Sequence, residues 1–195
     1  MPIVVDKDER RAQVISVAFD LVADEGIEAL TFREIAAANG CSTSIVSHYF
    51  RNKNELLFKV YQVANERAKE RLSAACEAGE SLLACFDAIL PVDEASRRNW
   101  RVWLAFWSRA HLEPAYLDER RRAAEDSLAH YRQMLANSLG VDPASSTLEI
   151  PARRLIAAVA GIGLEACFAP EDWTTSRMHE VLAAVLSDLG ASAKT

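Results

Sequence analysis

The 195-residue sequence contains little glycine and proline, with seven and six residues respectively. Half of its residues are hydrophobic, and alanine and leucine are the most frequent. Glycine and proline interrupt helices, whereas alanine and leucine favour them. The composition therefore predicts an all-α protein, and we expect about nine helices. The length allows one large domain or two small ones.

Motifs for catalysis or metal binding are also lacking. The four cysteines form no Cys-x-x-Cys pair, and the four histidines form no His-x3-His pair. No glycine-rich phosphate loop or nucleophile elbow appears in the sequence. We therefore expect no cofactor, no metal site and no enzyme activity, and we interpret the cysteines as free thiols in a reducing cytosol. An enzyme site assembled only by folding and a redox switch remain as alternatives.

Long hydrophobic runs are lacking as well. The most apolar segment, Leu155–Leu164, is far shorter than the about 20 residues that a helix needs to cross a bilayer. Near the N-terminus only Ile3–Val5 is apolar before a charged stretch, so we expect no signal peptide. The sequence predicts a soluble, cytoplasmic protein. Its net charge of −6 argues against a protein that coats nucleic acid non-specifically.

The segment Thr31–Lys59, TFREIAAANGCSTSIVSHYFRNKNELLFK, has the spacing of a helix-turn-helix. Thr31 is a predicted cap of its first helix. Ala36 is small enough for two helices to cross closely, and Gly40 permits the left-handed turn between them. Val46 is expected to be buried between the two helices. A preceding helix, from a cap at Asp6 to about residue 25, would support this pair.

The outward residues of the second helix suit contact with DNA. They are short and polar, and can approach base edges in a major groove: Thr43, Ser44, Ser47 and His48. Basic residues that suit phosphate follow directly: Arg51, Lys53 and Lys59. The alternative is a helical hairpin with a solvated polar face. Residues 1–60 hold 7 Lys/Arg against 9 Asp/Glu, so DNA binding requires the acids, such as Asp20 and Asp24, to face away from DNA.

A long helix is predicted from Lys53 to about Ala78, because no stop signal occurs before Gly79. At 1.5 Å per residue it would be about 35–40 Å long. It would begin in the N-terminal core and end in a second one. We therefore predict a DNA-binding domain over residues 1–52 and an effector-binding and dimerisation domain over residues 53–195, linked by this helix. Further helices are expected over about 79–90, 93–110, 115–139, 148–168 and 175–189.

Aromatic residues gather on the predicted helix over residues 93–110. Trp100, Trp103 and Trp107 share one helix face, which indicates either ordinary core or the wall of a ligand cavity. Indole faces attract cations, so an acid facing the cavity would favour a cationic ligand. The candidate effector-binding residues are Trp103, Phe106, Trp107, Tyr131 and Glu165.

The last two predicted helices carry broad apolar stripes. The helix over residues 148–168 is apolar nearly all round, which a chain of this size covers poorly by itself. We expect these helices to form a homodimer interface, with an intrachain core as the alternative. The candidate interface residues are Leu155, Val159, Ile162, Leu182, Val185, Leu186 and Leu189.

These patterns resemble a known family. The segment TFREIAAANGCSTSIVSHYFRNKNELL is similar to the DNA-binding domain of the TetR family of bacterial transcriptional repressors. The resemblance implies an all-helical dimer, each subunit having a three-helix DNA-binding domain and a helical effector domain. It places Arg33 at the groove edge and Lys53 on a phosphate. The complete set of candidate DNA-binding residues is Arg33, Ser42, Thr43, Ser44, Ser47, His48, Tyr49 and Lys53.

The second half has a more particular likeness. NWRVWLAFWSRA and RRLIAAVAGIGLEACF resemble the effector domain of BetI-type repressors, which answer to choline and control glycine betaine synthesis. Gly163 stands where the BetI pattern has a large aromatic residue, so the ligand is left open. We predict a homodimeric repressor on a pseudo-palindromic operator, released by a small-molecule effector, with no membrane partner. The alternatives are a protein-interaction adaptor that retains the fold and a repressor specific for choline-like quaternary ammonium ligands.

Overall fold

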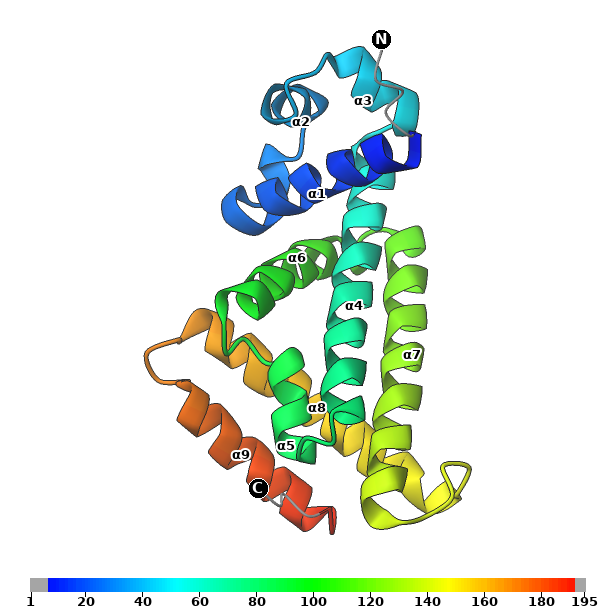
Figure 1. Cartoon of the computed structure of the whole chain (residues 1–195), viewed down its shortest axis with the longest axis vertical. Helices are drawn as coiled ribbons and strands as arrows, with labels where there is room; N and C mark the ends of the chain where they lie inside the picture. The colour runs from blue at the N-terminus through cyan, green and yellow to red at the C-terminus, as the bar shows by residue number, and fades with distance from the viewer. Residues whose placement is uncertain (1–6, 192–195) are drawn as a thin grey trace.

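The computed structural model describes residues 7–191, and within that range the chain is helical, with nine α-helices and no strand (Figure 1). The predicted all-α fold is confirmed. The predicted cap at Asp6 lies outside the described residues. No helix in this range combines the length and the apolar character needed to cross a membrane.

The N-terminal helices form the predicted helix-turn-helix on a supporting helix. Thr31 caps the second helix, since its Oγ1 accepts a hydrogen bond from the Glu34 amide at 3.1 Å. Gly40 takes the left-handed turn with φ of +60°, and Ala36 and Val46 are buried where the helices cross. The elements are α1 (Lys7–Glu25), the 3₁₀ turn η1 (Ile27–Ala29), α2 (Phe32–Ala38) and α3 (Thr43–Tyr49).

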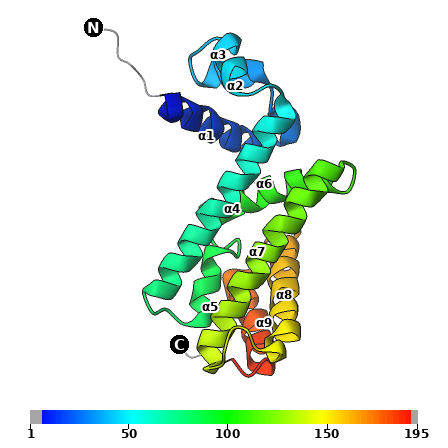
Figure 2. The ribbon, with the colours of Figure 1, turned by 90° about the vertical axis from the view of Figure 1, so that its right-hand side faces the viewer.

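Helix α4 (Lys53–Glu77) runs unbroken from the helix-turn-helix into the second half of the molecule (Figure 2). Its 25 residues correspond to about 37 Å at the usual rise of an α-helix. The side chain of Asn52 caps its first turn by accepting a hydrogen bond from the Glu55 amide at 2.9 Å. Gly79, with φ of +77°, follows its end. The continuous helix predicted over this segment is confirmed.

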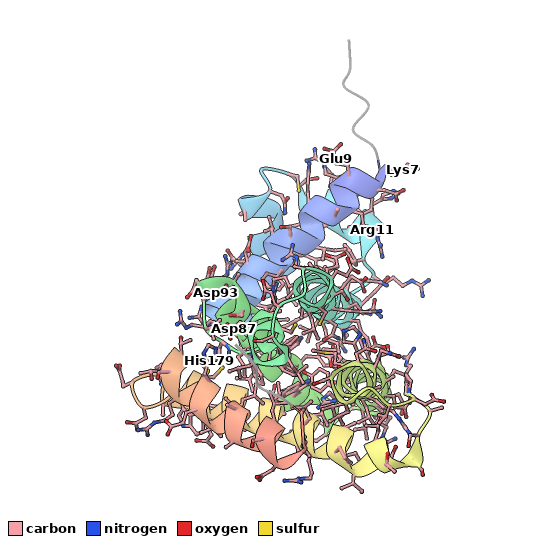
Figure 3. The ribbon with its side chains drawn as sticks, turned by 60° about the horizontal axis from the view of Figure 1, so that its bottom comes forward. Lys7, Glu9, Arg11, Asp87, Asp93 and His179 are labelled. Carbon is pink, nitrogen blue, oxygen red and sulfur yellow. The ribbon has the colours of Figure 1, made fainter. Side chains whose placement is uncertain are left out.

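The second half contains helices α5 to α9. Helices α5 and α6 pack on α4, α7 packs on α6 and α8, and α9 packs on α8 and α5. Their bounds are α5 (Leu82–Cys85), η2 (Phe86–Ala88), α6 (Glu94–Ala110), α7 (Pro114–Leu139), η3 (Ser146–Leu148), α8 (Glu149–Phe168) and α9 (Thr175–Asp188). His179 of α9 contacts Asp87 of η2 and so ties the last helix to this bundle (Figure 3).

The helix expected over residues 79–90 is shorter than predicted, with one α-helical turn followed by a 3₁₀ turn. The helix begins only after Ser81, whose hydroxyl caps it by accepting from the Ala84 amide at 3.2 Å. At its other end, distant side chains satisfy two carbonyl groups that a helix ending at Leu90 would leave unpaired. The Ile89 carbonyl accepts from Trp100 Nε1 at 2.7 Å, and the Ala88 carbonyl accepts from Arg71. Pro91, which has no N–H to donate and disfavours helical geometry in the residue before it, follows closely.

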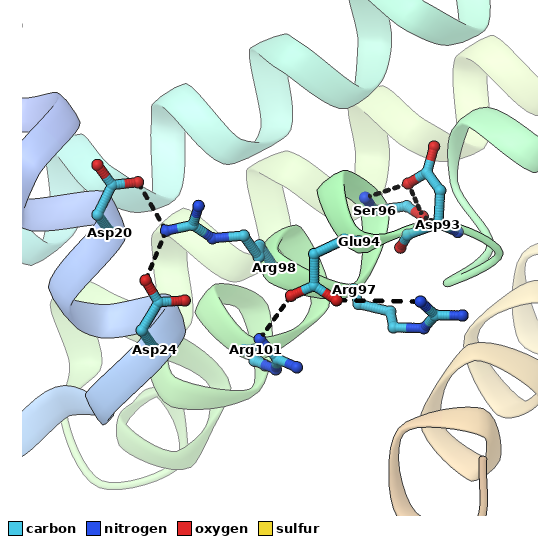
Figure 4. Close-up of polar contacts among 8 residues, drawn as sticks. All are labelled: Asp20, Asp24, Asp93, Glu94, Ser96, Arg97, Arg98 and Arg101. Carbon is cyan, nitrogen blue, oxygen red and sulfur yellow. Dashed lines mark hydrogen bonds and ion pairs between the residues drawn. The ribbon is translucent and has the colours of Figure 1, made fainter. Parts of the chain in front are cut away.

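Apolar contacts cross the predicted boundary at residues 52 and 53. One buried cluster joins α1 to α4 with α6, and a second joins the end of α4 with α5, α7, α8 and α9. A polar contact reinforces the crossing, because Arg98 of α6 donates to Asp20 at 2.7 Å and to Asp24 at 2.8 Å on α1 (Figure 4). These two acids therefore face α6, while the division into residues 1–52 and 53–195 stays a prediction.

Candidate functional site

Helix α3 presents a short polar surface at the end of the molecule opposite α9 (Figure 1). Val46 points into the core, and Tyr49 is half-buried. The exposed residues on and just before this helix are Ser42, Thr43, Ser44, Ser47 and His48. The hydroxyl of Ser42 contacts that of Ser44 at 2.7 Å instead of capping a backbone amide. The surface carries donors and acceptors without a bulky side chain in front of them.

Basic side chains flank this polar surface. Arg33 is exposed beside Glu34, and Lys53 Nζ lies 3.6 Å from Glu28 at the start of α4. Arg10 of α1 borders the same hollow as Ser44 and His48. Figure 3 shows Lys7 and Arg11 on the neighbouring turns of α1. The eight candidate DNA-binding residues thus lie on neighbouring elements, with α1 adding a further basic edge.

A cavity of about 520 Å³ lies between α4, α6, α7 and α8. Its wall is mostly apolar and aromatic, as is usual for small-molecule sites in helical proteins. The aromatic residues of this wall are Tyr61, Trp100, Trp103, Trp107 and Tyr131. Its charged residues are Glu66, Lys69, Glu119, Arg120, Arg122 and Asp126.

The three tryptophans of α6 form an ordered group. Trp103 and Trp107 are nearly parallel, with ring centroids 6.4 Å apart, and Trp100 stands edge-on to both. The indole N–H of Trp107 donates to the Tyr61 hydroxyl on α4 at 3.4 Å. The indole nitrogen of Trp103 is buried without a hydrogen-bond partner. The face of α6 that the three tryptophans share therefore contributes both to the cavity wall and to the buried core.

The candidate effector residues divide into two groups. Trp103, Trp107 and Tyr131 lie in the cavity wall. Phe106 lies behind it, stacked on Tyr61 with ring centroids 3.8 Å apart. Glu165 is exposed on α8 and outside the wall, because its position on the helix turns it away from α6 and α7.

Glu119 is the buried acid of the cavity wall, and the sequence prediction did not select it. It is 8% exposed, accepts a hydrogen bond from Gln62 Nε2 at 3.0 Å, and pairs with Arg122 at 2.8 Å. Its place three residues after Tyr116 on the inward stripe of α7 was the available signal. The wall thus combines indole faces with a carboxylate.

His130 is a second buried polar group in this wall, and its Nε2 atom has no hydrogen-bond partner. Burial, and then the charge of Lys69, lowers the pKa of His130 from its ordinary value of 6.5. At pH values between the folded and unfolded pKa of His130, this residue binds more protons in the unfolded chain than in the folded one. The contribution of His130 to stability is therefore full above pH 6.5 and is lost as the pH falls. The uncharged imidazole is the form that the fold stabilises.

We expect His130→Gln to weaken the pH dependence of stability. Urea unfolding at pH 7.5 and pH 5.5 should show a smaller loss of unfolding free energy in the variant than in the wild type, because glutamine does not take up a proton. Equal losses in the two proteins would contradict a lowered His130 pKa.

The candidate interface residues on α8 and α9 lie mainly inside the chain. Five of them are at most 3% exposed: Leu155, Val159, Ile162, Leu182 and Leu186. Val185 and Leu189 are half-buried. The opposite face of α8 is exposed and apolar, with Ile150 at 64%, Leu164 at 37% and Phe168 at 76% exposure, and with Ala157 and Gly161 between them.

Gly163 belongs to the inward face of α8 and lies against Trp100. A Cβ atom at this position would be 2.0 Å from Trp100 Cζ2, whereas the neighbouring Gly161 has open space. Real Cβ atoms do not approach other atoms so closely. The indole of Trp100 therefore fills the space that any side chain at residue 163 would need.

Comparison with known proteins identifies related families for both the N-terminal and the C-terminal part of the chain. Residues 14–60 match the family described as bacterial regulatory proteins of the tetR family, and residues 78–191 match the C-terminal domain of BetI-type transcriptional repressors. The regulator PksA of Bacillus subtilis is 25% identical over 93% of this chain and 90% of its own length. BetI of Paraburkholderia phymatum is 32% identical over 59% of this chain and 61% of its own length.

Solved structures share the fold. A transcriptional regulator from Rhodococcus has a TM-score of 0.80 at 26% identity, covering 93% of this chain and 97% of its own. The structure of a Saccharomonospora viridis protein in complex with choline has a TM-score of 0.80 at 21% identity, covering 92% and 96%. The chain therefore belongs to the TetR family of bacterial transcriptional regulators, which are not enzymes, and its C-terminal part is of the BetI type.

Proposed function

We propose that this regulator binds a pseudo-palindromic operator as a homodimer and is released when a small organic molecule enters the cavity between α4, α6, α7 and α8. It would act in the cytoplasm, on double-stranded DNA. One observation carries the proposal: two of the four helices that line the cavity, α4 and α6, also support the DNA-binding unit.

Two helices provide this support. Helix α4 starts directly after the helix-turn-helix and carries Tyr61 into the cavity wall. Helix α6 carries the three tryptophans and packs on α1, where Arg98 holds Asp20 and Asp24. A ligand that prefers one arrangement of α4 and α6 would shift the population of DNA-binding conformations by its difference in affinity for them.

The exposed face of α8 supports a dimer. Ile150, Leu164 and Phe168 lie on one side of this helix, and Gly161 allows the backbone of another helix to approach. Two copies related by a twofold axis would cover this face with itself. The two α3 helices would then read successive major grooves, about 34–36 Å apart.

The residues of the cavity wall indicate the chemical class of the ligand. Indole faces and a buried carboxylate, Glu119, suit an organic cation. The choline held by the Saccharomonospora protein supports the same class. We propose a cation with an apolar body, since Leu72, Ile89 and Ile156 line the rest of the cavity.

The DNA part of this proposal predicts two kinds of mutational effect. Lys53→Ala should weaken binding to all DNA sequences and lower the slope of log affinity against log salt by about 1, because a phosphate contact is lost. Thr43→Ala or Ser47→Ala should change the preferred base at one operator position, with about 1–3 kcal/mol of discrimination. Mobility shifts with the chain's own upstream DNA and single-base variants measure both.

Arg153→Ala is the matched control, because it removes one positive charge from α8, far from α3. It should leave the salt slope unchanged. Failure of the wild type to shift its upstream DNA at physiological salt would favour the adaptor alternative. Equal losses by the Lys53 and Ser47 variants on every operator would contradict the division into phosphate and base contacts.

A further inference from the structure

Arg120 lies over the aromatic ring of Trp107 inside the cavity. Its guanidinium carbon lies 4.7 Å from the centroid of the Trp107 ring, and both residues belong to the cavity wall. Its neighbours are paired differently, Arg121 with Asp118 and Arg122 with Glu119. Among the residues that the structure describes, no carboxylate forms a salt bridge with Arg120. The Trp107 ring is therefore its defined partner.

We propose that Arg120 occupies the face of Trp107 that receives the cationic head of the effector, and that the effector must displace Arg120 to bind. The inference rests on the proposed function and names the event that begins the response. In this structure the protein's own guanidinium already shows that the face of Trp107 accepts a cation.

Arg120 must be displaced because two cations cannot occupy the same face of Trp107. Like charges at contact distance repel, and Trp100 and Trp103 already flank the Trp107 ring within α6. Arg120 is only half-buried, so its long side chain can turn into solvent without leaving a buried charge unpaired. The carboxylates of Glu66 and Asp126 also line the wall, beside the Glu119–Arg122 pair, so an incoming cation meets negative charge there.

The exchange also changes a contact between helices. Arg120 belongs to α7 and Trp107 to α6, while the Trp107 N–H bonds to Tyr61 of α4. Loss of the guanidinium from the ring removes one contact between α7 and α6, at the point where α6 is hydrogen-bonded to α4. A ligand that binds here would therefore act on the two helices that support the DNA-binding unit.

Removal of the internal cation should strengthen the binding of an external one. We expect Arg120→Met, which keeps the apolar stem, to bind choline and tetramethylammonium about tenfold more tightly than the wild type, equivalent to about 1.4 kcal/mol. Arg121→Met is the matched control, because it removes the same charge one residue away on the exposed surface. It should change affinity less than about twofold.

A neutral probe separates charge from shape. The carbon analogue 3,3-dimethylbutan-1-ol has the shape of choline without its charge, and should bind both proteins equally weakly. Arg120→Lys keeps a cation and should stay within about threefold of the wild type. Isothermal titration calorimetry on the full-length chain gives the affinities, and thermal unfolding confirms that each variant is folded.

Three results would overturn the proposal: equal choline affinity in Arg120→Met and wild type, an equal gain in Arg121→Met, or no binding of either cation to any variant. The proposed function is tested separately by mobility shifts without ligand. Intact DNA binding together with any of these three results would reject the displacement of Arg120 and leave the proposed repressor function standing. Loss of specific DNA binding would reject the repressor itself.

Discussion

Gly163→Ala is expected to lower the free energy of unfolding by about 3 kcal/mol. The new methyl group would lie 2.0 Å from Cζ2 of Trp100 and 2.5 Å from two further atoms of the same indole. Trp100 is 1% exposed, and its N–H is held by the Ile89 carbonyl at 2.7 Å, so the ring cannot move without losing a buried hydrogen bond. Either α8 or the indole must shift, and the cavity wall shifts with it.

The same helix provides a matched control, because a Cβ at Gly161 meets nothing within 4 Å. Within one chain, Gly161→Ala should be neutral, or more stable by up to about 1 kcal/mol, since alanine favours the helix. Gly161 also lies on the proposed dimer face, so any cost of this substitution should appear as weaker association. Urea unfolding at one fixed protein concentration measures both variants, and sedimentation reports any change in association. Adding Trp100→Phe to Gly163→Ala should recover part of the loss, and equal costs at the two glycines would contradict the proposed contact.

Phe168→Arg is expected to convert the protein to a monomer and to weaken operator binding at least about 100-fold. The side chain is 76% exposed on the apolar face of α8, so the substitution should leave the fold of one chain intact. In a dimer, the new charge would be buried against its own copy without a partner. A monomer contacts only one half-site, and loses the contribution of the second recognition helix.

Leu112→Arg is the control for this substitution. Leu112 is also apolar and 69% exposed, but it lies in the turn between α6 and α7. Sedimentation and mobility shifts should show a dimer with no loss of operator affinity. A Phe168→Arg protein that remains dimeric would show that another surface forms the interface.

The helix-turn-helix could be predicted from the sequence because its signals are local. The Thr31 cap, the turn at Gly40 and the buried Val46 depend on residues close to them in the chain, and the structure has all three. The continuity of α4 was predictable for the same reason, since no stop signal precedes Gly79. In contrast, the helix expected over residues 79–90 was too long, because the chain turns at Gly79, Ser81 caps the helix, and its last turn is 3₁₀.

The candidate sites were harder to predict where the answer depends on which helices meet. Helix α8 is apolar nearly all round, and periodicity alone does not say which face its own chain covers. Leu155 and Val159 proved to lie inside, while Leu164 and Phe168 lie outside. Glu165 and Glu119 illustrate the same limit, because an acid on a helix joins a cavity wall only if the opposing helix is on its side.

The contact of Arg98 with Asp20 and Asp24 restricts which DNA-binding units this effector domain can accept. A chimera that replaces residues 1–52 with the corresponding segment of another regulator keeps Arg98 but exchanges its two acids. A donor without acids at these positions would leave the guanidinium unpaired against α1, and the graft would lose the polar contact that reinforces the apolar packing of α1 on α6. Recombination between regulators of this type should therefore favour donors that carry an acid pair one helical turn apart.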